Sequence, residues 1–177
     1  MAQSVELTLD PVTDLAITEQ WRRLAEAGLP SARRPVPSEH HRPHITLFAS
    51  DAVSPAADQA LPALVGELDL RVRVGAVLLF GPRRNAYVFV RQVVPSAELL
   101  DLQQRVAELC GANRYGQFGP GRWSPHVTLA RRIRTEQIAP ALDLVATDDE
   151  LDAHVTQCRR WDGDARTAWW LTPPEHT

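Results

Sequence analysis

Short stretches of alternating hydrophobic and polar residues run along this chain, with longer amphipathic stretches between them. Alternation over residues 5–9 predicts a half-buried strand, and apolar residues three or four positions apart predict a helix over residues 14–28. A hairpin is expected with its turn at Gly81 and Pro82. The remaining predicted strands are 43–47, 70–74, 77–80, 87–90, 125–129, 151–157 and 167–171, and the remaining predicted helices are 54–68, 95–111 and 135–145.

Two of the predicted strands carry nearly the same five residues, Pro-His-Ile/Val-Thr-Leu, at 43–47 and 125–129. Successive side chains of a strand point to opposite faces, so the histidine and threonine share one face and the aliphatic pair shares the other. Each stretch is therefore expected to bury its aliphatic pair under helices and to present an imidazole and a hydroxyl. These polar residues are His44 and Thr46 in the first stretch, and His126 and Thr128 in the second.

The similarity between the two halves of the chain extends beyond these motifs. A shift of 82 positions also aligns residues 23–26 with 105–108, and the order helix, loop, motif strand, helix, hairpin repeats. We interpret this as an internal duplication. It predicts one bilobal domain over 1–177, with pseudo-repeats at about 1–82 and 83–164 and with 165–177 completing the sheets. A pseudo-twofold axis would bring the two histidines into one central cleft, lined by antiparallel sheets with helices packed outside.

Composition excludes several kinds of enzyme. All 19 basic residues are arginine, so no lysine is present for a Walker A loop, a Schiff base or a covalent nucleotide adduct. A compositional bias of the source genome explains the missing lysine better than selection does, and the chemical exclusions hold in either case. The net charge of −3 argues against non-specific coating of duplex nucleic acid. A length of 177 residues is that of one compact domain.

The cysteine and histidine spacings do not favour a metal site. The two cysteines, Cys110 and Cys158, are far apart in sequence, and the three histidines at 40, 41 and 44 lie on a predicted loop without a fixed tetrahedral geometry. We therefore expect neither a metal nor a cofactor. The chain has no signal-peptide pattern and no apolar run long enough for a membrane span, so we expect a cytoplasmic protein with free thiols.

A pair of histidines facing one cleft is suited to acid and base catalysis at a phosphodiester. Histidine has a pKa of about 6.5, so one ring can accept a proton while the other donates one. One imidazole would deprotonate the attacking hydroxyl or water, and the other would protonate the departing oxygen. Hydroxyl groups of Thr46 and Thr128 are suitable donors to the phosphate oxygens on which negative charge grows. Either histidine could take either role, because the two motifs are nearly interchangeable.

The paired His-x-Thr motifs resemble those of the two-histidine phosphoesterase superfamily. Residues 44–48 and 126–131 are similar to its bacterial 2′-5′ RNA ligase and RNA 2′,3′-cyclic phosphodiesterase branch. The resemblance implies an α+β bilobal fold and cleavage of 2′,3′-cyclic phosphates at an RNA 3′ end or on a small cyclic nucleotide. It also implies reversible ATP-independent 2′-5′ joining, and it implies that Arg131 binds phosphate.

Further substrate contacts are expected from the loops that precede the motif strands. Arginine grips phosphate with a planar fork, and aromatic rings stack on bases. The candidates are Arg42, Arg122, Tyr115 and Phe118. A solvated surface charge is the equal alternative for each arginine. Trp123 could also stack on a base, and core packing is its equal alternative. The alternative function is a non-catalytic module that binds RNA ends or nucleotides in the same cleft, and in either case we expect a monomer.

Overall fold

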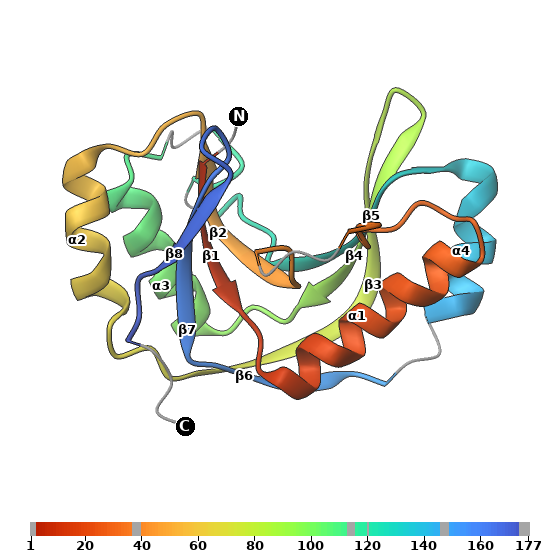
Figure 1. Cartoon of the computed structure of the whole chain (residues 1–177), viewed down its shortest axis with the longest axis horizontal. Coiled ribbons are helices and arrows are strands. Elements are labelled where there is room, and N and C mark those ends of the chain that lie inside the picture. Colours follow the sequence, from red (N-terminus) through yellow and green to blue (C-terminus); the bar gives the residue numbers. More distant parts are fainter. Residues whose placement is uncertain (1–2, 37–39, 113–115, 120, 146–148, 174–177) are drawn as a thin grey trace.

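The computed structural model describes residues 3–36, 40–112, 116–119, 121–145 and 149–173, and its eight described strands form one antiparallel sheet (Figure 1). The strand order is β6-β3-β4-β5-β2-β1-β7-β8. The strands are β1 (Gln3–Thr8), β2 (His44–Ser50), β3 (Leu70–Arg83), β4 (Ala86–Val93), β5 (His126–Arg134), β6 (Leu151–Val155), β7 (Gln157–Asp162) and β8 (Thr167–Trp170). The helices are α1 (Pro11–Glu26), α2 (Pro55–Val65), α3 (Ala97–Leu109), the 3-10 turn η1 (Thr135–Gln137) and α4 (Ile138–Val145).

The two motif strands, β2 and β5, lie next to each other in the middle of the sheet. Ile45 of β2 is paired with Val127 of β5, and this contact joins the two expected sheets into one. The α+β class and the antiparallel pairing are confirmed. Each half of the sheet takes strands from both halves of the chain, since β3 lies beside β4 and β7 lies beside β1. The internal duplication stays a prediction.

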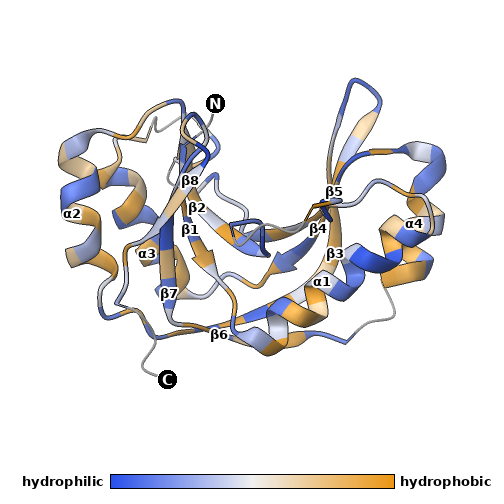
Figure 2. Cartoon of the chain, in the orientation of Figure 1, coloured by the Kyte–Doolittle hydropathy of each residue, from blue (hydrophilic) through white to orange (hydrophobic). Residues whose placement is uncertain are grey.

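Each helix that precedes a motif strand covers the half of the sheet that holds the other motif. Helix α1 contacts β5, β6 and α4, whereas α3 contacts β2, β3 and α2. In Figure 1, α2 and α3 accordingly lie at one end of the molecule and α1 and α4 at the other. Hydrophobic and hydrophilic residues alternate along the helices in Figure 2, as expected when one helix face packs against a sheet.

The aliphatic residues of both motifs form the centre of the hydrophobic core. Ile45, Leu47, Val127 and Leu129 are each 0% exposed, which confirms the predicted division of the two faces. In the part of the chain that the structure describes, none of the helices combines the length and the apolar composition needed to cross a bilayer.

Side-chain caps set the helix starts. Asp10 accepts hydrogen bonds from the backbone N–H groups of residues 12 and 13, so α1 begins at Pro11 rather than at the expected Asp14. Ser54 and Ser96 cap α2 and α3 by accepting hydrogen bonds from the backbone N–H groups of Ala57 and Leu99. These caps use only local residues, which is why the sequence reveals them.

The turn of the β3–β4 hairpin differs from the expectation. Arg83 pairs with Ala86, and the two residues between them, Arg84 and Asn85, have φ values of 52° and 58°. Two residues with positive φ form the tight turn that matches strand twist, so β3 continues through the predicted Gly81–Pro82 turn. The hairpin projects well beyond the rest of the sheet (Figure 1).

The predicted strand over 151–157 is two strands. Residues 151–155 form β6 beside β3, and β7 starts at Gln157 beside β1. The chain therefore passes from one end of the sheet to the other at Thr156. The alternation of apolar and polar residues runs from Leu151 to Thr156 and ends there, because Gln157 is polar at a position where the pattern requires an apolar residue. The predicted strand extended past Val155, the last residue of β6, to the first residue of β7, and the pairing partners separate the two strands.

Candidate active site

The rings of both motif histidines are held by the backbone in the same way. The Nδ1 atom of His44 lies 2.8 Å from the carbonyl oxygen of Arg42, and that of His126 lies 2.8 Å from the carbonyl oxygen of Ser124. A carbonyl oxygen only accepts, so each Nδ1 donates a hydrogen. The Nε2 atom of each ring is consequently the one available for proton exchange.

The register at the centre of the sheet brings the four motif side chains together on one face. Because β2 and β5 are antiparallel and Ile45 pairs with Val127, the histidine of each strand is directed toward the threonine of the other. His44, Thr46, Thr128 and Arg131 line a cavity of about 330 Å³, whereas His126 is not among its lining residues. The charges of His44 and Arg131 nevertheless act on His126. The remaining lining residues include Glu6, Trp21, Arg34, His40, His41, Arg159 and Trp161.

Two tryptophans hold the motif strands at the point where β2 and β5 separate. The indole Nε1 of Trp21 donates to the carbonyl oxygen of Thr128 at 2.9 Å, and that of Trp123 donates to the carbonyl oxygen of Thr46 at 3.0 Å. These indoles occupy carbonyl groups that a partner strand would otherwise bind. Trp123, for which base stacking and core packing were equal alternatives, packs against the core.

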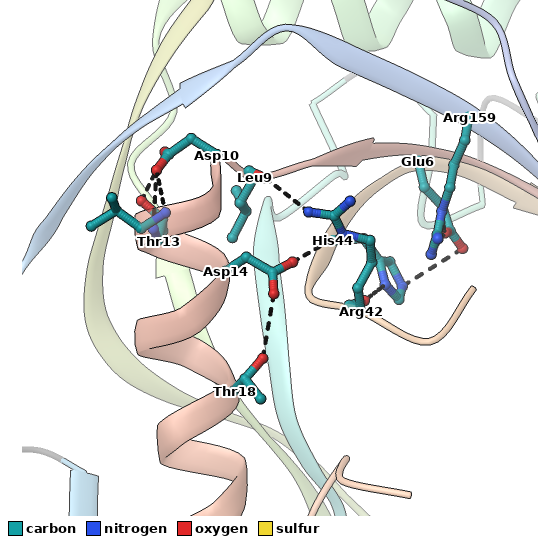
Figure 3. A network of polar contacts seen from close by, with 10 residues as sticks. Glu6, Leu9, Asp10, Thr13, Asp14, Thr18, Arg42, His44 and Arg159 are labelled. Carbon is teal, nitrogen blue, oxygen red and sulfur yellow. Dashed lines mark hydrogen bonds and ion pairs between the residues drawn. The ribbon is translucent and has the colours of Figure 1, made fainter. Parts of the chain in front are cut away.

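The sequence did not identify Glu6, a buried carboxylate beside His44. Its Oε1 atom lies 3.6 Å from Nε2 of His44 and 2.6 Å from the hydroxyl of Ser4, and Arg159 donates to its Oε2 at 2.8 and 3.0 Å (Figure 3). Burial alone would raise the pKa of Glu6, but the charges of His44 and Arg159 and the hydrogen bonds from Ser4 and Arg159 lower it below its usual value. Glu6 is thus a buried anion.

Strand β1 is buried on both faces, whereas its alternating pattern predicted a half-buried strand. Glu6 is 5% exposed and Thr8 is 2% exposed, although both occupy the polar positions of the alternation. The cavity face of β1 is covered because Arg159 of β7 lies over it and β2 flanks it. The only sequence signal for Glu6 was its polar position in a strand.

His126 has a more apolar setting. The ring of Phe80 meets it edge to face, with centroids 4.9 Å apart and planes at 80°. Burial lowers the pKa of His126, and the positive charges of His44 and Arg131 lower it further, against the opposing effect of the hydrogen bond to Ser124.

We expect His126 to lose its ring proton below pH 6.5, the ordinary value for histidine. A lowered pKa means that the neutral ring persists to lower pH. Arg131→Gln removes one of the responsible positive charges and should therefore raise the pKa of His126. Ring ¹⁵N NMR titration measures it, with Arg132→Gln as the control at the exposed neighbouring position. Equal shifts in both variants would contradict this account.

Arg42 is engaged outside the cavity. Its Nε donates to a carboxylate oxygen of Asp14 at 2.9 Å, and its Nη2 donates to the carbonyl oxygen of Leu9 at 3.3 Å (Figure 3). Arg42 therefore ties the loop before β2 to the start of α1. Its backbone carbonyl, rather than its guanidinium, serves the site by holding His44.

The other expected contacts lie apart from the four motif side chains. Phe118 packs on Phe48, with ring centroids 5.7 Å apart, and lines a separate hollow. Arg122 is exposed, and its backbone N–H binds the carbonyl of Gly119. Tyr115 lies outside the described residues.

The histidines before the first motif are also in contact with the site. His41 stacks on Trp21 with centroids 5.2 Å apart, and its Nε2 lies 2.5 Å from the carbonyl oxygen of Ala32. His40 also lines the cavity, and its ring centroid lies 6.4 Å from that of Trp161. Within the described ranges, no three histidine, cysteine or acidic side chains lie together as a metal site requires.

Two His-x-Thr strands side by side on one antiparallel sheet define the two-histidine phosphoesterase class. The chain belongs to the 2′-5′ RNA ligase superfamily, whose family model matches residues 11–170. This membership supports phosphoesterase-type chemistry.

Solved structures with the same fold have low sequence identity to this chain. TT0787 of Thermus thermophilus is 19% identical, with 97% of this chain and 95% of that chain covered and a TM-score of 0.58. Usb1 of Kluyveromyces marxianus is 12% identical, with 96% and 97% covered and a TM-score of 0.56. LigT of Escherichia coli complexed with 3′-AMP is 19% identical, with 95% and 92% covered and a TM-score of 0.54. No curated protein sequence matches significantly.

Proposed function

We propose that this protein is a metal-independent phosphoesterase that opens 2′,3′-cyclic phosphates at RNA 3′ ends or on small nucleotides. The observation that carries the proposal is the pairing of Ile45 with Val127, which directs both motif histidines and both motif threonines to one face. The two free Nε2 atoms provide one proton acceptor and one proton donor.

The reaction needs two proton transfers and no change of oxidation state. The neutral imidazole takes a proton from water as the water oxygen forms a bond to phosphorus. The bond from phosphorus to one ribose oxygen breaks, and its electron pair stays on that oxygen, which receives a proton from the imidazolium. The products are a phosphate monoester and a free ribose hydroxyl. With a 5′-hydroxyl in place of water, the same transfers form a 2′-5′ linkage.

Charge that develops on the phosphate is met by donors on the same face. The hydroxyls of Thr46 and Thr128 and the guanidinium of Arg131 lie around the cavity and can bind the non-bridging oxygens. A volume of about 330 Å³ is in the range of small-ligand sites and suits one terminal nucleotide. The complexes of Escherichia coli LigT with 3′-AMP and with ATP support a nucleotide as the ligand class.

The direct test is turnover of an oligonucleotide that ends in a 2′,3′-cyclic phosphate, measured in the presence of a chelator. We expect opening to a single monophosphate isomer at an undiminished rate, because protons and hydrogen bonds meet every charge change. Chromatography against 2′- and 3′-phosphate standards identifies the isomer.

Two results would contradict the proposal in different ways. Loss of turnover in chelator, with recovery on adding a divalent ion, would exclude the metal-independent mechanism. Binding of the oligonucleotide without turnover would instead identify a non-catalytic module for RNA ends.

A further inference from the structure

The two motif histidines occupy matching strand positions, but the flanking strands give them different neighbours. Beside β2, strand β1 pairs Glu6 with Thr46. Beside β5, strand β4 pairs Val90 with Thr128. A carboxylate therefore stands on the His44 side at the position where an aliphatic side chain stands on the His126 side.

The carboxylate of Glu6 is oriented by its other partners. Both contacts from Arg159 go to Oε2, while Oε1 accepts the Ser4 hydroxyl and faces Nε2 of His44 (Figure 3). The separation of 3.6 Å from His44 is longer than a hydrogen bond. Glu6 can thus stabilise a charged ring while its Nε2 hydrogen stays free to reach a substrate oxygen.

The carboxylate of Glu6 differs in charge from the other residues that line the cavity. Glu6 is the sole acidic side chain among the described residues that line it, whereas Arg34, Arg131 and Arg159 carry positive charge and His40 and His41 lie nearby. A positively charged lining favours the binding of a phosphate, whereas a carboxylate in the same lining would repel it. The anion is instead buried, paired with Arg159 and adjacent to one histidine only.

The groups that act on His126 have the opposite character. It meets the edge of Phe80, and the charges acting on it are those of His44 and Arg131, both of which disfavour a second positive charge. A proton on His44 therefore helps to keep His126 neutral. Two interacting rings of this kind share their protons as a pair.

We propose that Glu6, oriented by Ser4 and Arg159, is a positioning residue whose negative charge faces Nε2 of His44 and favours the imidazolium form of that ring, so that His44 is the general acid and His126 the general base. The acid and base steps of this inference rest on the proposed function, whereas the effect of Glu6 on the charge of His44 does not. Water loses its proton to Nε2 of His126, and the departing ribose oxygen takes the proton from Nε2 of His44. After product release, His126 returns its proton to solvent and His44 regains one, which restores the starting state.

The test is Glu6→Gln, which keeps the shape of the side chain and removes its charge. The amide oxygen can still accept from Arg159, whereas the amide nitrogen cannot accept from Ser4. We expect the alkaline limb of kcat/KM, which reports loss of the acid, to move to lower pH by about one unit. The acidic limb, which reports protonation of the base, should move to higher pH by a smaller amount. The reason is that His44, the neighbour of His126, then carries less positive charge. The profile narrows from both sides and its maximum falls.

Asp58→Asn is the matched control, because it also removes the carboxylate partner of a buried arginine on β7. Arg160 contacts Asp58 at 2.5 Å, and its side chain points to the other face of the sheet from that of Arg159. We expect a loss of stability with both limbs of the profile unchanged. If Glu6→Gln unfolds the protein, Glu6→Gln/Arg159→Gln removes both buried charges and receives the same measurements.

Ring ¹⁵N NMR titration of the variants, which needs no substrate, separates the two proposals. We expect Glu6→Gln to move the His44 transition to lower pH and Asp58→Asn to leave it in place. That shift without turnover of cyclic phosphate would overturn the proposed function and leave the role of Glu6 standing. An unchanged His44 transition and unchanged limbs in a folded variant that lacks the charge would overturn the role of Glu6.

Discussion

His44→Ala and His126→Ala are each expected to lower kcat for a 2′,3′-cyclic phosphate by about 10²- to 10⁴-fold. In the proposed mechanism each ring carries one of the two proton transfers. Because each Nδ1 is bound to a backbone carbonyl, each ring has only its Nε2 for this transfer, so one ring cannot do the work of both. The double variant should be little worse than either single one, because the two rings act as a unit. Single-turnover kinetics with a cyclic-phosphate oligonucleotide would measure the chemical step directly.

His154→Ala is the control for these variants. This histidine lies on β6 and pairs with Asp69, away from the lining of the cavity, so its loss should leave kcat unchanged. Substrate affinity should change little in His44→Ala and His126→Ala, because Arg131 and both threonines are still present to bind the phosphate. A loss confined to KM would contradict the acid and base roles.

Thr46→Val and Thr128→Val should each lower kcat by about 10²- to 10³-fold, the usual effect of removing one preplaced donor to a developing oxyanion. Valine keeps the branched shape of threonine, so the half-buried strand position remains filled. The effect should fall on kcat more than on KM, because charge on the non-bridging oxygens is greatest in the transition state.

Serine at the same positions separates the hydroxyl from the packing. Thr46→Ser and Thr128→Ser keep the donor and remove only a methyl group, so they should retain most of the activity. Thermal unfolding of all four variants would show whether the strand pairing survives. Serine variants as impaired as the valine variants would mean that these threonines act through packing.

The strands, the helices and the two motifs were predictable because their signals are local. Period-two alternation, a capping side chain and a His-x-Thr spacing depend on neighbours within a few positions. The faces of both motif strands follow from this periodicity, and the burial of Ile45 and Leu47 confirms it. The errors occurred where pairing partners set the outcome, as at Thr156, where β6 ends and β7 begins.

The surroundings of the site depend on contacts between distant parts of the chain. Arg159 lies 153 positions after Glu6, and Trp21 lies 107 positions before the carbonyl that it holds. Arg42 was expected at the substrate because loops before motif strands often carry binding residues, but Asp14 engages its guanidinium. No periodicity in the sequence encodes such pairs.

The candidate catalytic residue types and the strand faces on which they lie follow from the amino-acid order alone, because a strand turns each successive side chain to the opposite face. The alignment of two motifs 82 positions apart, and the carboxylate that distinguishes one histidine from its counterpart, came from the fold. Sheet order sets which strands flank β2 and β5, and electrostatic interactions fall off with distance in space rather than along the chain.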